Sequence, residues 1–136
     1  WLSFCIESSV EQIKKEMEID LDGYWETHYV FEKESKSRRK SIGEALKNSI
    51  LINLVSPFLF LYGDFHHKKF LKEKALEILQ EIKPESNSII EKWNDLGVEP
   101  KSAFESQALL ELKNEYCSAK KCLNCNVGVK LLNKHG

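Results

Sequence analysis

Residues 41–62, which read SIGEALKNSILINLVSPFLFLY, decide the fold class. Apolar side chains recur along this stretch at helical spacing, and toward its end they cover nearly every side of the helix, as in a central core helix. Ser41 and Glu44 stand three residues apart and predict a capping box at the start of the helix.

Pro57 should kink or interrupt this helix near residues 53–56, because proline lacks a backbone N–H donor. Gly63 and Asp64 should then form a turn. The apolar run itself, residues 50–62, is shorter than the roughly 20 residues that a bilayer-spanning helix needs. We therefore expect a soluble protein that does not enter a membrane.

Two helices are predicted on either side of this stretch. Ser9 and Gln12 form a capping box ahead of a short amphipathic helix. Residues 70–82 carry apolar side chains at helical spacing and stop before Pro84, because a residue that precedes proline disfavours the helical conformation.

Three shorter helices are predicted in the rest of the chain. A serine, either Ser86 or Ser88, caps the first, and Gly97 closes it in the left-handed conformation. The second begins at Ser102 and ends at Cys117, and the third occupies the C-terminal end. No internal repeat or sustained strand period appears. The prediction is an all-α fold over residues 1–136, a single domain built as an irregular bundle of about six helices with a kinked central apolar helix.

Residues 24–40 are the least regular part of the chain. Residues 24–31 are rich in aromatic side chains, and the alternation over residues 28–32 would suit a short strand, but an irregular packed segment is the favoured interpretation. Residues 32–40 are polar and charged, which predicts an exposed loop.

Length and charge set broad limits on function. The chain has 136 residues, enough for one core, and its 20 basic and 21 acidic side chains nearly balance, so no overall charge draws it to nucleic acid or to an anionic membrane. A domain of this size has little need of disulfides, so the four cysteines are expected to be reduced and the protein cytoplasmic. Because position 1 is Trp, we expect a fragment of a longer protein.

Three cysteines near the C-terminal end have the spacing of metal ligands: Cys117, Cys122 and Cys125. Gaps of four and two residues allow three thiolates to converge on zinc or on part of an iron–sulfur cluster, but a closed site needs a fourth ligand. The candidates for the fourth position are Cys5, His28 and His135. The alternative is that the cysteines are small buried residues in a helix junction. A thioredoxin-like role would require a preceding strand, which is not predicted here.

Two basic segments are candidates for contact with a nucleic-acid backbone, or are simply solvated faces; they comprise Lys36, Arg38, Arg39, Lys40, His66, His67, Lys68 and Lys69. His28 lies among aromatic residues, where a hydrogen-bonded core histidine is favoured over a base or a ligand. No nucleophile has a histidine and a carboxylate nearby in the sequence, and there is no glycine-rich phosphate loop. The sequence therefore has no catalytic motif and shows no small-molecule substrate.

Four blocks of sequence together resemble a known family: residues 24–29 (YWETHY), 50–57 (ILINLVSP), 106–117 (SQALLELKNEYC) and 121–125 (KCLNC). They are similar to the C-terminal part of the bacterial domain-of-unknown-function family 2851, which is common in Bacteroidetes, and the resemblance extends over nearly the whole chain. It implies a helical scaffold or interaction domain whose partner is the N-terminal part of its own full-length protein.

The resemblance also carries an alternative function. The front half of the family looks like a metal-dependent nuclease, which would make this chain a helical accessory module that binds nucleic acid beside a nuclease core. The cysteine pattern of the family corresponds here to Cys117, Cys122 and Cys125, whereas Cys5 lies outside the similar blocks.

Overall fold

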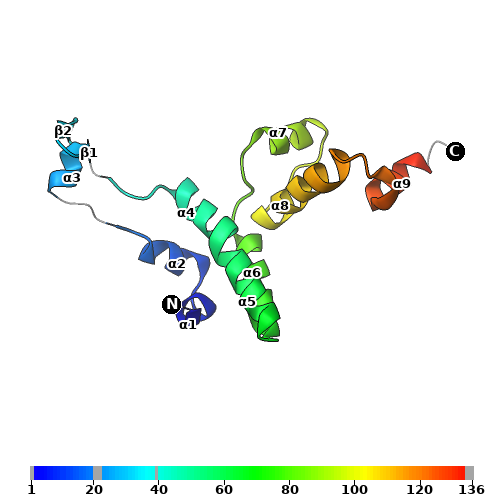
Figure 1. Cartoon of the computed structure of the whole chain (residues 1–136), viewed down its shortest axis with the longest axis horizontal. Helices are drawn as coiled ribbons and strands as arrows, with labels where there is room; N and C mark the ends of the chain where they lie inside the picture. The colour runs from blue at the N-terminus through cyan, green and yellow to red at the C-terminus, as the bar shows by residue number, and fades with distance from the viewer. Residues whose placement is uncertain (1, 20–22, 39, 134–136) are drawn as a thin grey trace. The chain divides into compact units, whose positions relative to one another are not determined.

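Most of the residues that the structure describes are helical, so the predicted helical fold class is confirmed. The structure is a computed structural model that describes residues 2–19, 23–38 and 40–133 (Figure 1). The chain divides into two compact units, Trp1–Ile78 and Leu79–Gly136.

The first unit begins with two short helices, α1 (Leu2–Glu7) and α2 (Val10–Glu16). The capping box before α2 is present as predicted. The Gln12 N–H donates to Ser9 Oγ over 3.3 Å, and the Ser9 N–H donates to Gln12 Oε1 over 2.8 Å. The sequence analysis did not predict α1. One residue of this helix, Cys5, is fully buried.

Replacing Ser9 with alanine is expected to lower the free energy of unfolding by about 1 kcal/mol, because the Gln12 N–H at the start of α2 loses its acceptor, Ser9 Oγ. Ser41→Ala is the matched control. The helix after Ser41 begins instead with Gly43 as its N-cap and has no side-chain cap, so the second predicted capping box was wrong. Urea unfolding should therefore show a clear loss for Ser9→Ala and a change within about 0.5 kcal/mol for Ser41→Ala. Equal losses would contradict the assigned caps.

A small hairpin follows, and here the favoured interpretation of the sequence was wrong. The helical turn α3 (Tyr24–Thr27) leads into the antiparallel strands β1 (His28–Val30) and β2 (Lys33–Glu34). The alternation at residues 28–32 was therefore a strand signal, and the predicted loop contains β2. The Glu32 N–H donates to the Tyr24 hydroxyl over 2.9 Å, which ties the hairpin turn back to α3.

The central helix is continuous over Glu44–Phe65, as α4 (Glu44–Ile50), a π-helical turn (Leu51–Val55) and α5 (Ser56–Phe65). The predicted interruption takes the form of the π-helical turn, which lies directly before Pro57. The Ser56 N–H donates to Leu51 O, five residues back. One wider turn accommodates the ring and the missing donor without ending the helix.

The predicted turn at Gly63 and Asp64 was wrong, because α5 continues to Phe65 and the turn is made by His66 and His67. Gly63 has a different role. A Cβ at this position would lie 2.9 Å from Leu71 Cβ and 2.9 Å from Lys68 O, so the glycine allows the following helix to approach α5 closely.

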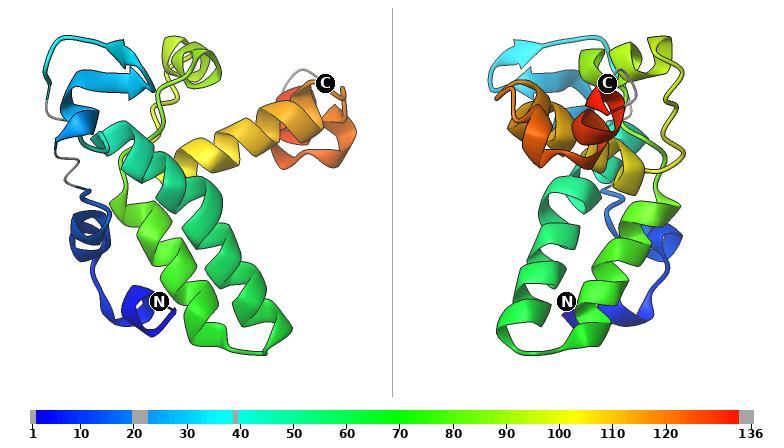
Figure 2. Two further views of the ribbon diagram at one scale, coloured as in Figure 1. Left: turned by 60° about the vertical axis from the view of Figure 1, so that its left-hand side comes forward. Right: turned by 90° about the vertical axis from the view of Figure 1, so that its right-hand side faces the viewer.

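The core of the first unit lies where one side of the central helix meets α6 (Lys69–Glu81). In Figure 2, both views show α5 and α6 side by side and antiparallel. The predicted helix over residues 70–82 is confirmed within one residue at each end. The buried apolar side chains of the two helices are Leu51, Ile52, Val55, Leu59, Leu71, Ala75 and Ile78.

The second unit contains α7 (Ser88–Asp95) and α8 (Ala103–Glu111). Ser102 caps α8 as predicted, and Gly97 has the predicted left-handed conformation, with φ of 78°. The prediction of Ser86 or Ser88 as a cap was wrong. Asn87 lies between them, and its side chain accepts hydrogen bonds from the N–H groups of Ile89 and Ile90.

The helix α8 continues as a π-helical segment (Leu112–Cys117), which is followed by a 3-10 turn (Cys122–Asn124) and α9 (Asn126–Leu132). Cys117 therefore lies at a helix end, and Cys122 and Cys125 frame the next turn, as the sequence predicted.

Candidate functional site

The three clustered cysteines line one cavity of about 220 Å³ in the second unit. Cys125 is buried, whereas Cys117 and Cys122 are exposed, and none of the three is in a disulfide. The rest of the wall is mainly apolar, contributed by Trp93, Leu112, Tyr116, Val127 and Gly128. The sequence spacing thus identified three residues that the fold does bring around one space.

Two backbone features place these cysteines. Lys120 is left-handed, with φ of 54°, and the Lys121 N–H donates to Tyr116 O over 2.9 Å, which turns the chain back after Cys117. On the other side, a Cβ on Gly128 would lie only 2.4 Å from Cys122 O. The start of α9 therefore lies directly against the cysteine turn, in a way that only glycine permits.

The described residues contain no group of three or more histidine, cysteine, aspartate or glutamate side chains already arranged to hold a metal ion. The three cysteines share a cavity, but they do not form a preassembled ligand set. Of the candidates for a fourth ligand, Cys5 and His28 belong to the first unit, and His135 lies outside the described residues. Burial raises the pKa of the Cys5 thiol.

His28 has the hydrogen-bonded role that the sequence favoured, although it is half-buried and not part of a closed core. Its ring stacks on Tyr24, with 3.8 Å between ring centroids. Its Nδ1 lies 2.9 Å from Tyr24 O and 2.9 Å from Thr27 Oγ1. These contacts hold the ring inside the hairpin.

The two basic segments have mixed surroundings. Lys36 and Arg38 are exposed, and Arg39 lies outside the described residues. Lys40 is engaged within the hairpin, since its Nζ donates to His28 O and lies 3.6 Å from the centre of the Tyr29 ring.

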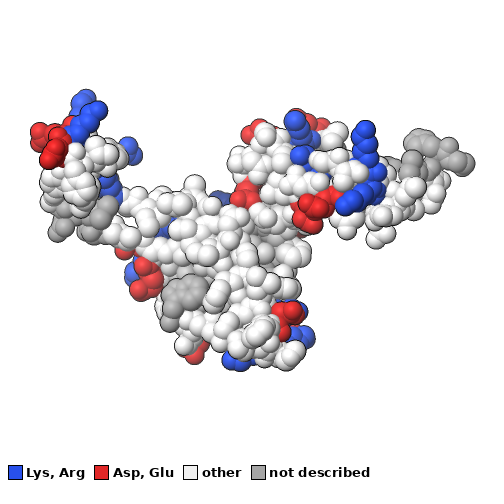
Figure 3. Space-filling view, in the orientation of Figure 1, with Lys and Arg blue, Asp and Glu red and all other residues white. Residues whose placement is uncertain are grey.

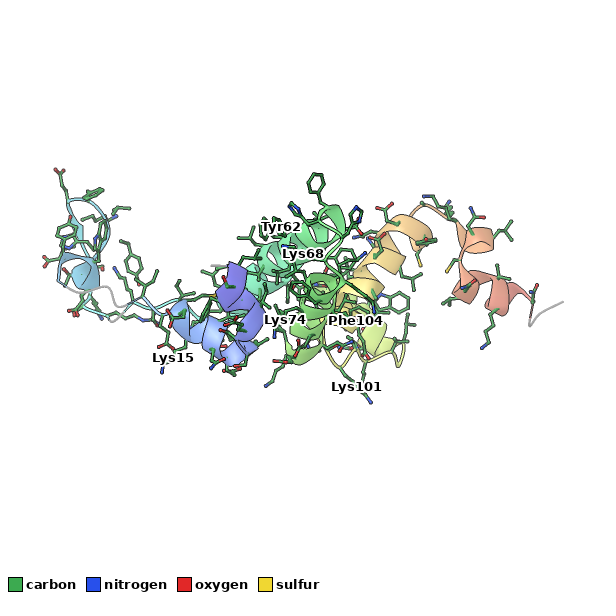
Figure 4. The ribbon with its side chains drawn as sticks, turned by 90° about the horizontal axis from the view of Figure 1, so that it is seen from below. Lys15, Tyr62, Lys68, Lys74, Lys101 and Phe104 are labelled. Carbon is green, nitrogen blue, oxygen red and sulfur yellow. The ribbon has the colours of Figure 1, made fainter. Side chains whose placement is uncertain are left out.

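In the second basic segment, His66, His67, Lys68 and Lys69 are exposed at the turn between α5 and α6. Lys69 forms an exposed ion pair with Glu73, and Lys68 lies near Tyr62, with Nζ 5.8 Å from the ring centre (Figure 4). Nucleic-acid binding by either segment stays a prediction.

The sequence analysis missed an exposed apolar face on the central helix of the first unit. The interpretation of this helix as an apolar core helix is correct for one side only. Leu54, Leu61 and Phe65 are 63%, 68% and 81% exposed, and Phe58 is 45% exposed. Positions 54, 58, 61 and 65 are spaced by four, three and four residues, so they share one side of the helix. We call these four residues the apolar face.

Among the described residues, Glu44–Phe65 is the helix that is long and apolar enough to cross a bilayer, judged by length and composition alone, and 33% of its most apolar stretch is buried. The sequence analysis counted only residues 50–62 and so underestimated the length of this helix, which continues beyond both ends of that run. The same test is passed by core helices of soluble proteins.

An open cavity of about 470 Å³ lies at the end of α5 beside α6, lined by charged and apolar side chains. Lys72 Nζ is 2.7 Å from Asp64 Oδ1 and 4.8 Å from the centre of the Phe60 ring. The hydrogen bond and charge of Lys72 hold the pKa of the Asp64 carboxyl below its ordinary value. This ion pair fastens the exposed end of the two helices.

Comparison with known proteins decides the family. The profile of DUF2851, described as a protein of unknown function, matches residues 1–88. The chain belongs to the DUF2851 family. Neither a curated protein nor a solved structure matches the chain.

The DUF2851 match covers part of the region in which the sequence showed the resemblance. The match includes the hairpin, the central helix and α6, so the apolar face lies inside the family region. It ends before residues 106–125, so the two blocks that carry the cysteines are not part of the match.

Proposed function

We propose that this DUF2851 chain is a noncatalytic helical interaction module, and that its apolar face binds an amphipathic α-helix of a protein partner. The observation that carries the proposal is the exposure of Leu54, Leu61 and Phe65 on one side of a helix. Soluble proteins seldom expose large apolar side chains in a continuous row unless the row binds something.

The spacing of the apolar face favours a helix as the occupant. Steps of four, three and four residues match the a and d positions of a heptad seam, into which the apolar side chains of a second helix fit as knobs into holes. The central helix already pairs with α6 through its opposite side. A partner helix on the apolar face would therefore complete a three-helix arrangement.

Charge indicates which helix would fit. In Figure 3, the middle of the visible face carries few charged side chains, and side chains of both signs lie near the turn between α5 and α6. Beside Phe65, that turn carries His66, His67 and Lys68, all exposed. A partner helix with acidic side chains at the end that meets this turn would complement it. The partner suggested by the sequence, the N-terminal part of the full-length protein, is the first natural source to examine for such a helix.

A lipid bilayer is the competing occupant, and the ends of the central helix argue against it. Lys47 is buried and lies 3.4 Å from both Glu18 and Glu44, so one end is held by an ion-pair cluster. At the other end Asp64 pairs with Lys72 of α6. Inserting the helix into a bilayer would separate these charges from their partners or move them into hydrocarbon, which is unfavourable.

The test uses a synthetic helical peptide of about three heptads, with leucine at a and d and glutamate at one end, and a second peptide of scrambled order. We expect the full chain to bind the first peptide and not the second. Leu61→Glu should weaken binding at least about tenfold, since burying one leucine contributes about 1.5–3 kcal/mol. Leu96→Glu is the control, because Leu96 is 75% exposed but lies in the second unit.

Three outcomes would overturn the proposal. Equal affinity for the scrambled peptide would mean that the face has no preference for a helical seam. Partition into phosphatidylcholine vesicles that Leu61→Glu abolishes, without peptide binding, would assign the face to a membrane. Dimerisation in sedimentation equilibrium that the same variant abolishes would make a second copy of the chain the occupant.

A further inference from the structure

We propose that Cys117, Cys122 and Cys125 bind one thiophilic metal ion in the cavity that they share, with Zn²⁺ as the ion whose chemistry fits best. The three thiols are the soft ligands lining a space that is otherwise mainly apolar. Thiolate ligands select zinc, copper(I) and iron–sulfur clusters over hard cations. Three protein ligands with one open position are an established zinc arrangement.

The backbone around the cavity supports a ligand-binding role. A π-helical segment ends at Cys117, Lys120 is left-handed, and Gly128 approaches the Cys122 carbonyl more closely than any other residue could. Each of these conformations is uncommon, and such features concentrate at functional sites. All three act to bring the segment that carries Cys122 and Cys125 back toward the end of the preceding helix.

Charge also favours a metal with a single open position. Three thiolates and one Zn²⁺ carry a net charge of −1. Lys120 and Lys121 stand immediately before Cys122, are exposed, and supply positive charge beside the loop. An iron–sulfur cluster normally takes four cysteines, whereas the described residues place three around this cavity.

Binding requires the thiols to converge, because the described residues contain no preassembled ligand group. Rotation of a cysteine side chain between its staggered rotamers moves the sulfur without moving the backbone. Each thiol loses its proton to solvent as a Zn–S bond forms, so three S–H bonds break, three Zn–S bonds form, and no group is oxidised or reduced. Water occupies the fourth position until another ligand replaces it.

The test uses the full chain, reduced and kept anaerobic, with Co²⁺ as a spectroscopic probe and Zn²⁺ as its competitor. We expect one equivalent of Co²⁺ to give a thiolate-to-cobalt charge-transfer band, which Zn²⁺ removes. About three protons should be released per metal in weakly buffered solution, because the ligands bind deprotonated.

Cys122→Ser is the informative variant, because Cys122 is exposed and its loss should not disturb folding. Its zinc affinity should fall by more than the roughly 10- to 100-fold that loss of an outer-shell partner costs. Leu123→Ser is the matched control, since Leu123 is 78% exposed on the same turn and does not line the cavity, and it should leave the stoichiometry at one.

The proposal is overturned if the reduced chain shows no charge-transfer band, or if Cys122→Ser and Leu123→Ser bind zinc equally well. A Cys122–Cys125 disulfide that forms on mild oxidation, in a chain that binds no metal when reduced, would assign the cluster to thiol chemistry instead. Each of these results leaves the peptide-binding test of the apolar face unaffected.

Discussion

Leu59→Ala is expected to lower the free energy of unfolding by about 2–5 kcal/mol. Leu59 is fully buried on the side of the central helix that packs in the core of the first unit, together with Leu51 and Val55. Alanine would remove its apolar side chain and leave a cavity that neighbouring helices can fill only in part. Urea unfolding followed by far-UV circular dichroism measures the loss as a lower midpoint at unchanged slope.

Leu61→Ala is the matched control, because it makes the same chemical change two positions along the same helix. Leu61 is 68% exposed on the apolar face, so its replacement should change the free energy of unfolding by no more than about 0.5 kcal/mol. A large loss for Leu61→Ala in the isolated chain would show that this face is already buried, and would remove the basis of the proposed interaction surface.

The pair of leucines also shows where prediction from sequence succeeds and where it stops. A period of 3.6 residues predicted α6 within one residue at each end, because only one side of that helix is apolar. The central helix is apolar nearly all round, so its period does not say which side faces the core. Gly63 lies on the side that packs against α6, where its missing Cβ allows Leu71 to approach.

Local errors have similar physical causes. Three neighbouring polar residues lie at the start of α7, and each has a side chain that can accept hydrogen bonds, so the sequence could not choose Asn87 over Ser86 and Ser88. Pro57 was expected to kink or interrupt the helix, and the interruption takes the form of a π-helical turn through which the helix continues. A π-helical turn depends on a local balance of hydrogen bonds that has no simple sequence signature.

For the candidate metal site, the sequence could suggest ligands that are close together in the chain, but it could not say which distant residues lie near them. The gaps of four and two residues suit the single cavity that Cys117, Cys122 and Cys125 line, and a metal site there stays a prediction. The candidates for the fourth ligand were far away in the sequence, and only a tertiary structure can say whether such residues meet. The part of Gly128 in positioning the cysteines was likewise invisible, because the contact of its Cα with the Cys122 backbone has no sequence motif.

Gly128→Ala is expected to destabilise the second unit by about 1–3 kcal/mol. Two effects compete, since alanine is favoured over glycine within a helix by up to about 1 kcal/mol. Against this, the new Cβ would lie 2.4 Å from Cys122 O and 2.9 Å from Cys122 Cα. These are backbone atoms, so no flexible side chain can move aside, and either α9 or the cysteine turn must shift.

The measurement for Gly128→Ala is hydrogen exchange of the amides in α9 and in the cysteine turn, which should become faster, together with faster alkylation of Cys125, which is buried in the native chain. Gly43→Ala is the control, since a Cβ there meets nothing within 4 Å. As an N-cap substitution it should reduce stability by at most about 1 kcal/mol and leave exchange in α9 unchanged. If Gly128→Ala instead stabilised the chain and slowed exchange in α9, helix propensity would outweigh the clash. The close contact between α9 and the cysteine turn would then not be what positions the three thiols.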